Sequence, residues 1–246
     1  MKRQEIPIAV AGQSADAYFF TGDDERPRPG MLLLTDIKGI RLAYEEQAER
    51  LVKAGFAVLL PNVFFRGGRP PLFPFPFQSG EIKTVHRLQE LFAALPPEAQ
   101  LADAEIYLDC LTKMSGVRSG SLGVVGYCYT GAMAIRAAAA CPSKVQAAAS
   151  FHGGNLFTDL PESPHLLLPK IKAALHIGHA VDDKSMPAEA IASLDKALGA
   201  WGGKFTSKVY AGAQHGWTNR DSPIFNLPQA EQAFADLISF LRETLK

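Results

Sequence analysis

A glycine-flanked cysteine between an apolar run and an alanine-rich stretch constrains the fold of this chain more than any other feature. The run Leu122-Gly-Val-Val-Gly-Tyr-Cys-Tyr-Thr-Gly131 predicts a buried strand, a sharp turn and then a helix. Such a turn presents its central residue, Cys128, beyond the end of the strand, and it needs small neighbours because strand and helix approach closely. Gly126 meets that need, whereas Thr130 stands where a second glycine is usual. The alternative is an inert buried thiol in an alanine-rich helix.

Short apolar runs alternate with stretches of helical periodicity along the rest of the chain. Strands are expected at residues 31–35, 57–60, 122–127, 145–151, 173–177 and 204–210. Helices are expected at residues 41–54, 81–94, 101–114, 130–140, 187–198 and 227–244. This alternation predicts an α/β fold, a doubly wound and mostly parallel sheet with helices on both faces. No repeat or linker divides the chain, so we expect a single domain over residues 1–246.

Residues 64–80 are dense in proline, glycine and phenylalanine, a composition that cannot continue a helix. They predict an irregular flap near a pocket, with an ordinary surface loop as the alternative.

The composition excludes several classes of function. The 25 basic and 25 acidic residues cancel, so no broad charge favours nucleic acid or an anionic membrane as a partner. The amino terminus lacks a signal-length apolar segment and no later stretch could span a bilayer, which leads us to expect a cytoplasmic protein. Three cysteines without metal-ligand spacing predict neither disulfides nor a zinc site, and we expect no cofactor. The oligomeric state stays open, and a monomer is consistent with the sequence.

A cysteine nucleophile needs a neighbouring base, because its unperturbed pKa of about 8.5 leaves little thiolate at neutral pH. Two loops downstream of Cys128 supply an acid and a base. One follows the predicted strand at 173–177 and carries Asp182 and Asp183, and the other follows the strand at 204–210 and carries His215. The order nucleophile, acid, histidine is that of α/β-hydrolases. His152 ends a predicted strand and could instead line the pocket.

These motifs resemble the dienelactone hydrolase family, an α/β-hydrolase group with a cysteine nucleophile, over nearly the whole chain. Gly126-Tyr-Cys-Tyr-Thr-Gly131 is similar to the family's Gly-Tyr-Cys-x-Gly-Gly elbow, which implies that Cys128 is the nucleophile. The family's acid lies four residues before a proline, which selects Asp183 ahead of Pro187 and leaves Asp182 as a rival. The resemblance assigns the base to His215.

The resemblance also implies roles for residues outside the predicted triad. Backbone N–H groups of Ile37 and Tyr129 would form the oxyanion hole. Asp36 stands where the family has a glutamate that hydrogen-bonds the resting thiol. The resemblance implies that Arg66 binds the substrate carboxylate, and Arg220, one residue beyond the position of the family's second arginine, could join it, with a solvated surface arginine as the alternative for either. Apart from the resemblance, Trp217 could line an apolar pocket.

Together these features predict a hydrolase that cleaves a small lactone or carboxylic ester, of the carboxymethylenebutenolidase type, through a thioester acyl-enzyme. A broad carboxylesterase is the nearest alternative. A binding module that has lost catalysis is a third, although the chain retains a cysteine, an acid and a histidine in the expected order.

Overall fold

Eight strands form one sheet in the order β1-β2-β4-β3-β5-β6-β7-β8, in a computed structural model that describes residues 1–24 and 26–245. Six of the strands run parallel to one another: β3 (Arg28–Leu34), β4 (Ala57–Pro61), β5 (Val117–Tyr127), β6 (Val145–Phe151), β7 (Ala174–His179) and β8 (Phe205–Val209). The order reverses between β3 and β5, and in open α/β sheets ligands bind at the carboxyl ends of the strands beside such a reversal. The predicted mostly parallel sheet is confirmed.

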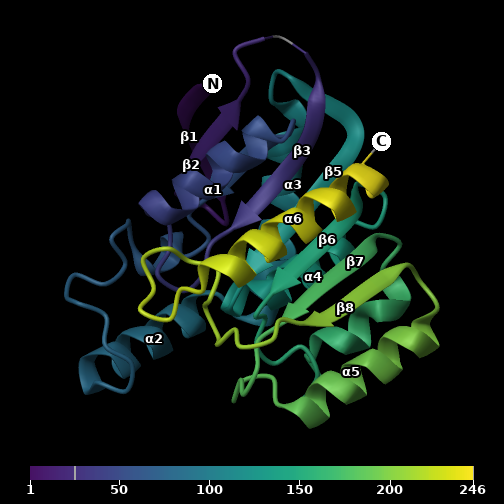
Figure 1. The fold of residues 1–246 in the computed structure, drawn as a ribbon. Coiled ribbons are helices and arrows are strands. Elements are labelled where there is room, and N and C mark those ends of the chain that lie inside the picture. Colours follow the sequence, from purple (N-terminus) through teal and green to yellow (C-terminus); the bar gives the residue numbers. More distant parts are fainter. Residues whose placement is uncertain (25, 246) are drawn as a thin grey trace.

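Helices cover both faces of the sheet (Figure 1). One face packs against α3 (Pro97–Lys113), α4 (Tyr129–Ala140) and α5 (Ala188–Trp201), and the other against α1 (Leu42–Lys53) and α6 (Leu227–Thr244). The flap leads from the short helix η1 (Phe65–Gly67) to α2 (Ile82–Ala94), and a second short helix, η2 (Pro164–Lys170), precedes β7. In Figure 1, α2 and the loop before α6 lie on the side to which β6 and β7 point.

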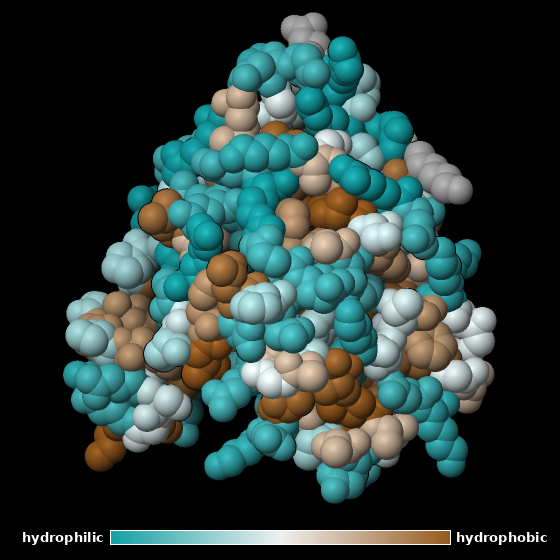
Figure 2. Space-filling view, viewed as in Figure 1, coloured by the Kyte–Doolittle hydropathy of each residue, from teal (hydrophilic) through white to brown (hydrophobic). Residues whose placement is uncertain are grey.

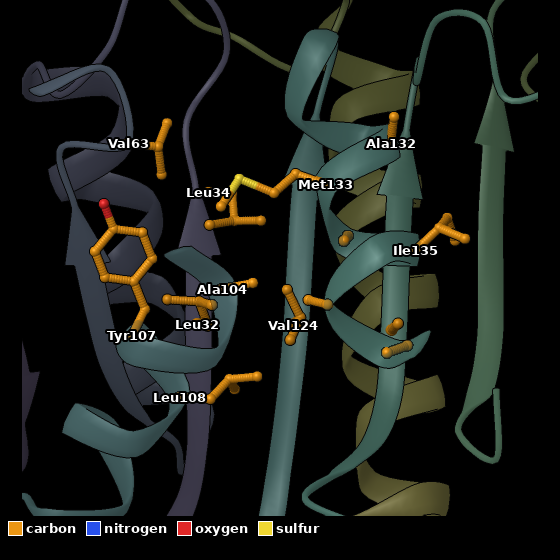
Figure 3. Packing of buried hydrophobic residues seen from close by; sticks show 14 of the residues in the cluster. Leu32, Leu34, Val63, Ala104, Tyr107, Leu108, Val124, Ala132, Met133 and Ile135 are labelled. Atoms are coloured by element: carbon orange, nitrogen blue, oxygen red, sulfur yellow. The ribbon is translucent and has the colours of Figure 1, made fainter. Parts of the chain in front are cut away.

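The central strands are apolar on both faces because helices cover both. Leu32 and Leu34 of β3 belong to the cluster that contains α3 and α4, while Met31 and Leu33 belong to the cluster that contains α1 and α6. Figure 3 shows Leu32, Leu34 and Val124 beside side chains of the first cluster. This alternation explains why the strand reads as an uninterrupted apolar run. On the α1 and α6 side, Figure 2 shows small groups of hydrophobic residues among hydrophilic ones.

Two strands at the amino terminus were not predicted. β1 (Lys2–Val10) and β2 (Gln13–Thr21) form an antiparallel hairpin that adds to the edge of the sheet beside β4. Ala11 and Gly12 both have positive φ, 49° and 76°, as a two-residue hairpin turn requires. β1 is largely exposed, so its polar residues do not show the apolar pattern of a buried strand.

The predicted helices are all present, with one notable shift in boundary. α3 begins at Pro97, four residues before the predicted start at residue 101, because proline is well tolerated at the first position of a helix. The predicted flap is confirmed as irregular between η1 and α2. No helix among the described residues is long and apolar enough to cross a membrane.

Candidate active site

Cys128 occupies the turn between β5 and α4. Its φ of 58° and ψ of −124° lie in a left-handed region that side-chain-bearing residues rarely adopt. The backbone N–H of Cys128 donates to the carbonyl oxygen of Phe151 at 3.1 Å, which fixes the turn against β6. The thiol is partly exposed rather than buried, unlike that of Cys141. The sharp turn therefore presents Cys128 at the carboxyl edge of the sheet.

The close approach at this turn falls on Gly126 and Gly131. A Cβ at Gly126 would collide with the carbonyl oxygen of Thr130, and one at Gly131 would collide with the hydroxyl of Ser150. The expectation that Thr130 fits poorly is corrected by its surroundings. Its hydroxyl accepts from the N–H of Tyr127 at 3.0 Å and lies 3.3 Å from the carbonyl oxygen of Leu34. Thr130 therefore joins the turn to β3 without crowding it.

Replacing Gly126 with alanine is expected to destabilise the fold by about 1–3 kcal/mol, because the added methyl meets rigid backbone. Thermal unfolding of the variant against the wild type measures this effect. Gly199 in α5 is the matched control, since a Cβ there meets nothing within 4 Å. Gly199→Ala should raise the melting temperature slightly, because alanine is the better helix former. Equal effects of the two substitutions would contradict the close approach at Gly126.

Asp183 and His215 come from the loops that follow β7 and β8 and form a hydrogen-bonded pair. Oδ2 of Asp183 lies 2.6 Å from Nδ1 of His215. Oδ1 of Asp183 accepts from both the hydroxyl and the backbone N–H of Ser185, at 2.7 and 2.9 Å. The neighbouring Asp182 is exposed and has no hydrogen bond or ion pair with the described residues. The structure thus pairs His215 with Asp183, not Asp182.

The carboxylate of Asp183 and the imidazolium of His215 each stabilise the ionised form of the other. Burial opposes ionisation of Asp183, but hydrogen bonds from His215 and Ser185 and the charge of His215 lower its pKa to about 2. Burial likewise opposes protonation of His215, yet its interactions with Asp183 and with the sulfur of Cys128 raise its pKa to about 10. His215 is therefore an imidazolium at neutral pH, suited to stabilising a thiolate at Cys128.

Cys128, Asp183 and His215 all border one open cleft of about 650 Å³. The cleft lies at the carboxyl edge of the sheet, where its other walls come from α2, the start of α4 and the loop before α6. Among the residues that the structure describes, no group of three or more histidine, cysteine or acidic side chains could hold a metal ion.

Two backbone N–H groups are free to bind an oxyanion. Tyr129 is the first residue of α4, and its N–H, like those of other first-turn residues, has no partner within the helix. Ile37 follows β3, where the neighbouring N–H groups of Lys38 and Gly39 both donate to Asp36. Neither the Tyr129 nor the Ile37 N–H has an acceptor among the described residues. Both therefore remain candidates for the oxyanion hole.

Asp36 is held in contacts other than those implied by the resemblance. Its carboxylate binds the guanidinium of Arg41 through two hydrogen bonds of 2.7 and 2.8 Å. The side-chain amide of Asn219 donates a further hydrogen bond of 2.8 Å. These partners occupy both carboxylate oxygens. Because Asn219 lies on the loop that carries His215, its hydrogen bond to Asp36 joins that loop to the loop after β3. The expected hydrogen bond to the thiol of Cys128 is absent among the described residues.

The two arginines expected to bind the substrate are turned to other partners. Arg66 forms two hydrogen bonds, of 2.6 and 2.8 Å, with the fully buried carboxylate of Asp103 in α3. Arg220 is exposed and lies 3.8 Å from Glu46 of α1, on the other face of the sheet. Neither lines the cleft. Their predicted contact with a substrate carboxylate is not supported.

Trp217 is a core residue and does not line the cleft. It is fully buried, and its ring centroid lies 5.1 Å from those of both Tyr210 and His152. The predicted substrate contact is therefore replaced by packing behind the loop that carries His215. The sequence offered little to separate the two roles, since a tryptophan two residues from a candidate base suits either.

Ser185, which the sequence did not indicate, and His152, which was a candidate for the pocket lining, both lie against the pair of Asp183 and His215. Ser185 contacts Asp183 as described, and its hydroxyl lies 3.4 Å from Nδ1 of His215. His152 lies behind the site, with its ring centroid 5.1 Å from that of His215 and its Nε2 2.9 Å from the hydroxyl of Thr218. Burial and the nearby charge of His215 lower the pKa of His152 well below its ordinary value, so it stays neutral.

Unusual backbone conformations gather at this edge of the sheet. Five non-glycine residues among those described have positive φ: Ala11, Cys128, His152, Asn155 and Asp182. All but Ala11 lie at or beside the cleft. Such conformations cost of order 1–3 kcal/mol each and tend to cluster at functional sites.

Comparison with known proteins agrees with this geometry. The family model described as the dienelactone hydrolase family matches residues 15–245. An assigned carboxymethylenebutenolidase of Escherichia coli is 24% identical over 240 residues, covering 96% of this chain and 85% of the relative. The solved structure of an assigned dienelactone hydrolase from Klebsiella pneumoniae superposes with a TM-score of 0.86 at 20% identity, covering 98% of each chain.

A dienelactone hydrolase-like promiscuous phosphotriesterase from metagenomic libraries also shares the fold. Its TM-score is 0.81 at 17% identity, covering 100% of this chain and 99% of that one. These likenesses identify the architecture as the α/β-hydrolase fold, as predicted. With the family model matching nearly the whole chain, the protein belongs to the dienelactone hydrolase family of ester and lactone hydrolases.

Proposed function

We propose that this protein hydrolyses a small carboxylic ester or lactone through Cys128, His215 and Asp183, with a thioester acyl-enzyme as intermediate. The observation that carries the proposal is the meeting of a partly exposed cysteine on a strained turn with the hydrogen-bonded His215 and Asp183 in one cleft. The carboxymethylenebutenolidase assignment of the relative from Escherichia coli is consistent with such a substrate.

Acylation begins with the thiolate of Cys128 attacking the carbonyl carbon of the bound ester. The carbonyl oxygen becomes negatively charged and accepts hydrogen bonds from the N–H groups of Tyr129 and Ile37. Because Nδ1 of His215 is bound to Asp183, Nε2 is the ring nitrogen that serves the reacting atoms. Its proton passes to the departing alkoxide as the carbon–oxygen bond breaks, which leaves a thioester on Cys128 and a neutral His215.

Deacylation reverses the roles of the same groups. Neutral His215 takes a proton from water at Nε2, and the resulting hydroxide attacks the thioester carbonyl. The second tetrahedral intermediate uses the same two N–H groups and collapses with release of the carboxylic acid. The sulfur leaves as a thiolate beside the regenerated imidazolium, whose charge Asp183 stabilises throughout.

The acyl-enzyme can be detected directly. Acid quenching within the first turnover of 4-nitrophenyl butanoate should give a protein whose mass is greater by one butanoyl group, and peptide mapping should place that group on Cys128. Cys110 and Cys141 serve as internal controls, because burial raises the pKa of both thiols. A full burst of 4-nitrophenol without any adduct on Cys128 would overturn the proposed intermediate.

The pKa of His215 predicts the alkaline limit of activity. Its imidazolium form is present below a pKa of about 10 and is lost as the pH rises through that value. Since acylation uses this proton, kcat/KM should fall on the alkaline side with a midpoint near pH 10. Initial rates with an ester that is stable between pH 7 and 11 measure this limb. A midpoint near 6.5, the ordinary value for histidine, would show that the raised pKa does not govern turnover.

A further inference from the structure

In the reacting form that the proposed mechanism requires, the charges that border the cleft sum to a net negative charge. In that form the thiolate of Cys128 and the imidazolium of His215 cancel, and the exposed Asp182 and Lys184 form a second neutral combination. The buried carboxylate of Asp183 remains. Lys184 is the one lysine or arginine among the described residues that line the cleft.

Arginines near this edge of the sheet cannot supply the missing positive charge. Arg66 is bound by two hydrogen bonds to Asp103, whose side chain is buried. Arg41 is bound in the same manner to Asp36, and its Nε lies 2.5 Å from a carboxylate oxygen of Asp221. Turning either guanidinium toward a ligand would remove a charged partner from a buried carboxylate, which is strongly unfavourable.

One wall of the cleft is instead aromatic. The rings of Phe92, at the end of α2, and Tyr129, at the start of α4, lie 4.6 Å apart between centroids. The hydroxyl of Tyr129 donates to the carbonyl oxygen of Leu95 at 2.8 Å, which fixes the orientation of that ring. Phe92 keeps 38% of its surface exposed, so a flat apolar group that covers it gains hydrophobic free energy. Val181 and Ile224 add aliphatic surface to the same cleft.

We infer that the cleft selects uncharged esters with an aryl group and disfavours esters that carry a free carboxylate. This inference rests on the proposed function. It departs from the carboxylate recognition that the resemblance implied through Arg66 and Arg220. A carboxylate on the substrate meets a reacting site of net negative charge with one exposed lysine, while an aryl group meets the rings of Phe92 and Tyr129.

Three esters of similar size test the charge preference: phenyl butanoate, 4-butanoyloxybenzamide and 4-butanoyloxybenzoate. Their kcat/KM values are divided by their rates of hydroxide-catalysed hydrolysis to remove differences in leaving group. We expect the benzoate to react at least about tenfold more slowly than the benzamide at low ionic strength, with the gap closing as salt screens the charges. Hydrolysis of none of the three would overturn the proposed function itself. Equal or faster hydrolysis of the benzoate would overturn the charge inference alone.

Variants of the exposed charges locate the source of the preference. Asp182→Asn should narrow the gap between benzoate and benzamide, and Lys184→Gln should widen it. Arg66→Ala should leave the ratio unchanged, because Arg66 is bound to Asp103. A benzoate rate that depends on Arg66, with a folded variant by circular dichroism, would overturn the inference and restore the role implied by the resemblance.

The aromatic wall has its own matched pair of variants. Phe92→Ala should lower kcat/KM for phenyl butanoate by about tenfold while changing that for ethyl butanoate by less than about threefold. Phe77, in the flap, is equally exposed at 38% but does not line the cleft, so Phe77→Ala is the control. Equal losses for aryl and alkyl esters in Phe92→Ala would overturn aryl selection.

Discussion

Cys128→Ala is expected to lower kcat for ester hydrolysis by about 10,000-fold or more. Without the sulfur no acyl-enzyme forms, and the residual rate comes from binding and from the N–H groups of Tyr129 and Ile37 alone. The rest of the site should persist, because the contact that fixes the turn is made by the backbone of Cys128 rather than by its thiol. Steady-state rates with phenyl butanoate and unfolding by circular dichroism separate loss of chemistry from loss of fold.

The controls for this experiment are the two other thiols. Cys110 lies in α3 and the buried Cys141 follows α4, and neither lines the cleft. Alanine at either position should leave kcat within about twofold of the wild type, although Cys141→Ala should cost some stability through lost packing. Retention of a tenth or more of the wild-type rate by Cys128→Ala would contradict the assignment of the nucleophile.

Asp183→Asn is expected to lower kcat/KM by about 100- to 10,000-fold. The amide loses the negative charge that raises the pKa of His215, so less imidazolium is present at neutral pH. The alkaline limb should therefore move from near pH 10 toward neutrality in this variant. Ser185 can still donate to the retained side-chain oxygen, which should preserve the loop. Both the drop in rate and the direction of the pH shift are measurable on one preparation.

Asp182→Asn is the matched control, because it removes the adjacent carboxylate from the same loop. Asp182 is exposed and has no partner among the described residues, so its loss should alter the rate for a neutral ester by less than about threefold. If Asp182→Asn lost as much activity as Asp183→Asn, the acid would have to be reassigned.

Local patterns predicted the architecture well. Runs such as Met31 to Leu34 are apolar at every position because helices bury both faces, and that signal is strong. The hairpin of β1 and β2 was missed because an exposed edge strand has no need of apolar residues. The glycine requirement at the turn was placed one residue early. Gly131, not residue 130, is the position at which α4 meets Ser150.

The candidate site was predictable where roles follow chain order and unpredictable where they depend on distant partners. Cys128, Asp183 and His215 each follow a predicted strand, and parallel strands bring their carboxyl ends together. By contrast, Arg66 is neutralised by Asp103, 37 residues away, and Arg220 lies near Glu46 of α1. Neither contact leaves a local signature in the sequence. Arg66 matched the family pattern by position, yet its partner decides what it can bind.

The positive φ at Cys128, His152, Asn155 and Asp182 also constrains how this protein can evolve. Glycine at Asn155 or Asp182 would relieve backbone strain, which raises thermal stability where that relief exceeds the added entropy of the unfolded chain. The same substitutions would also increase the backbone mobility of the two segments that contain Asn155 and Asp182 and line the cleft. Selection for heat resistance and selection for turnover would thus act in opposite directions on the same few positions.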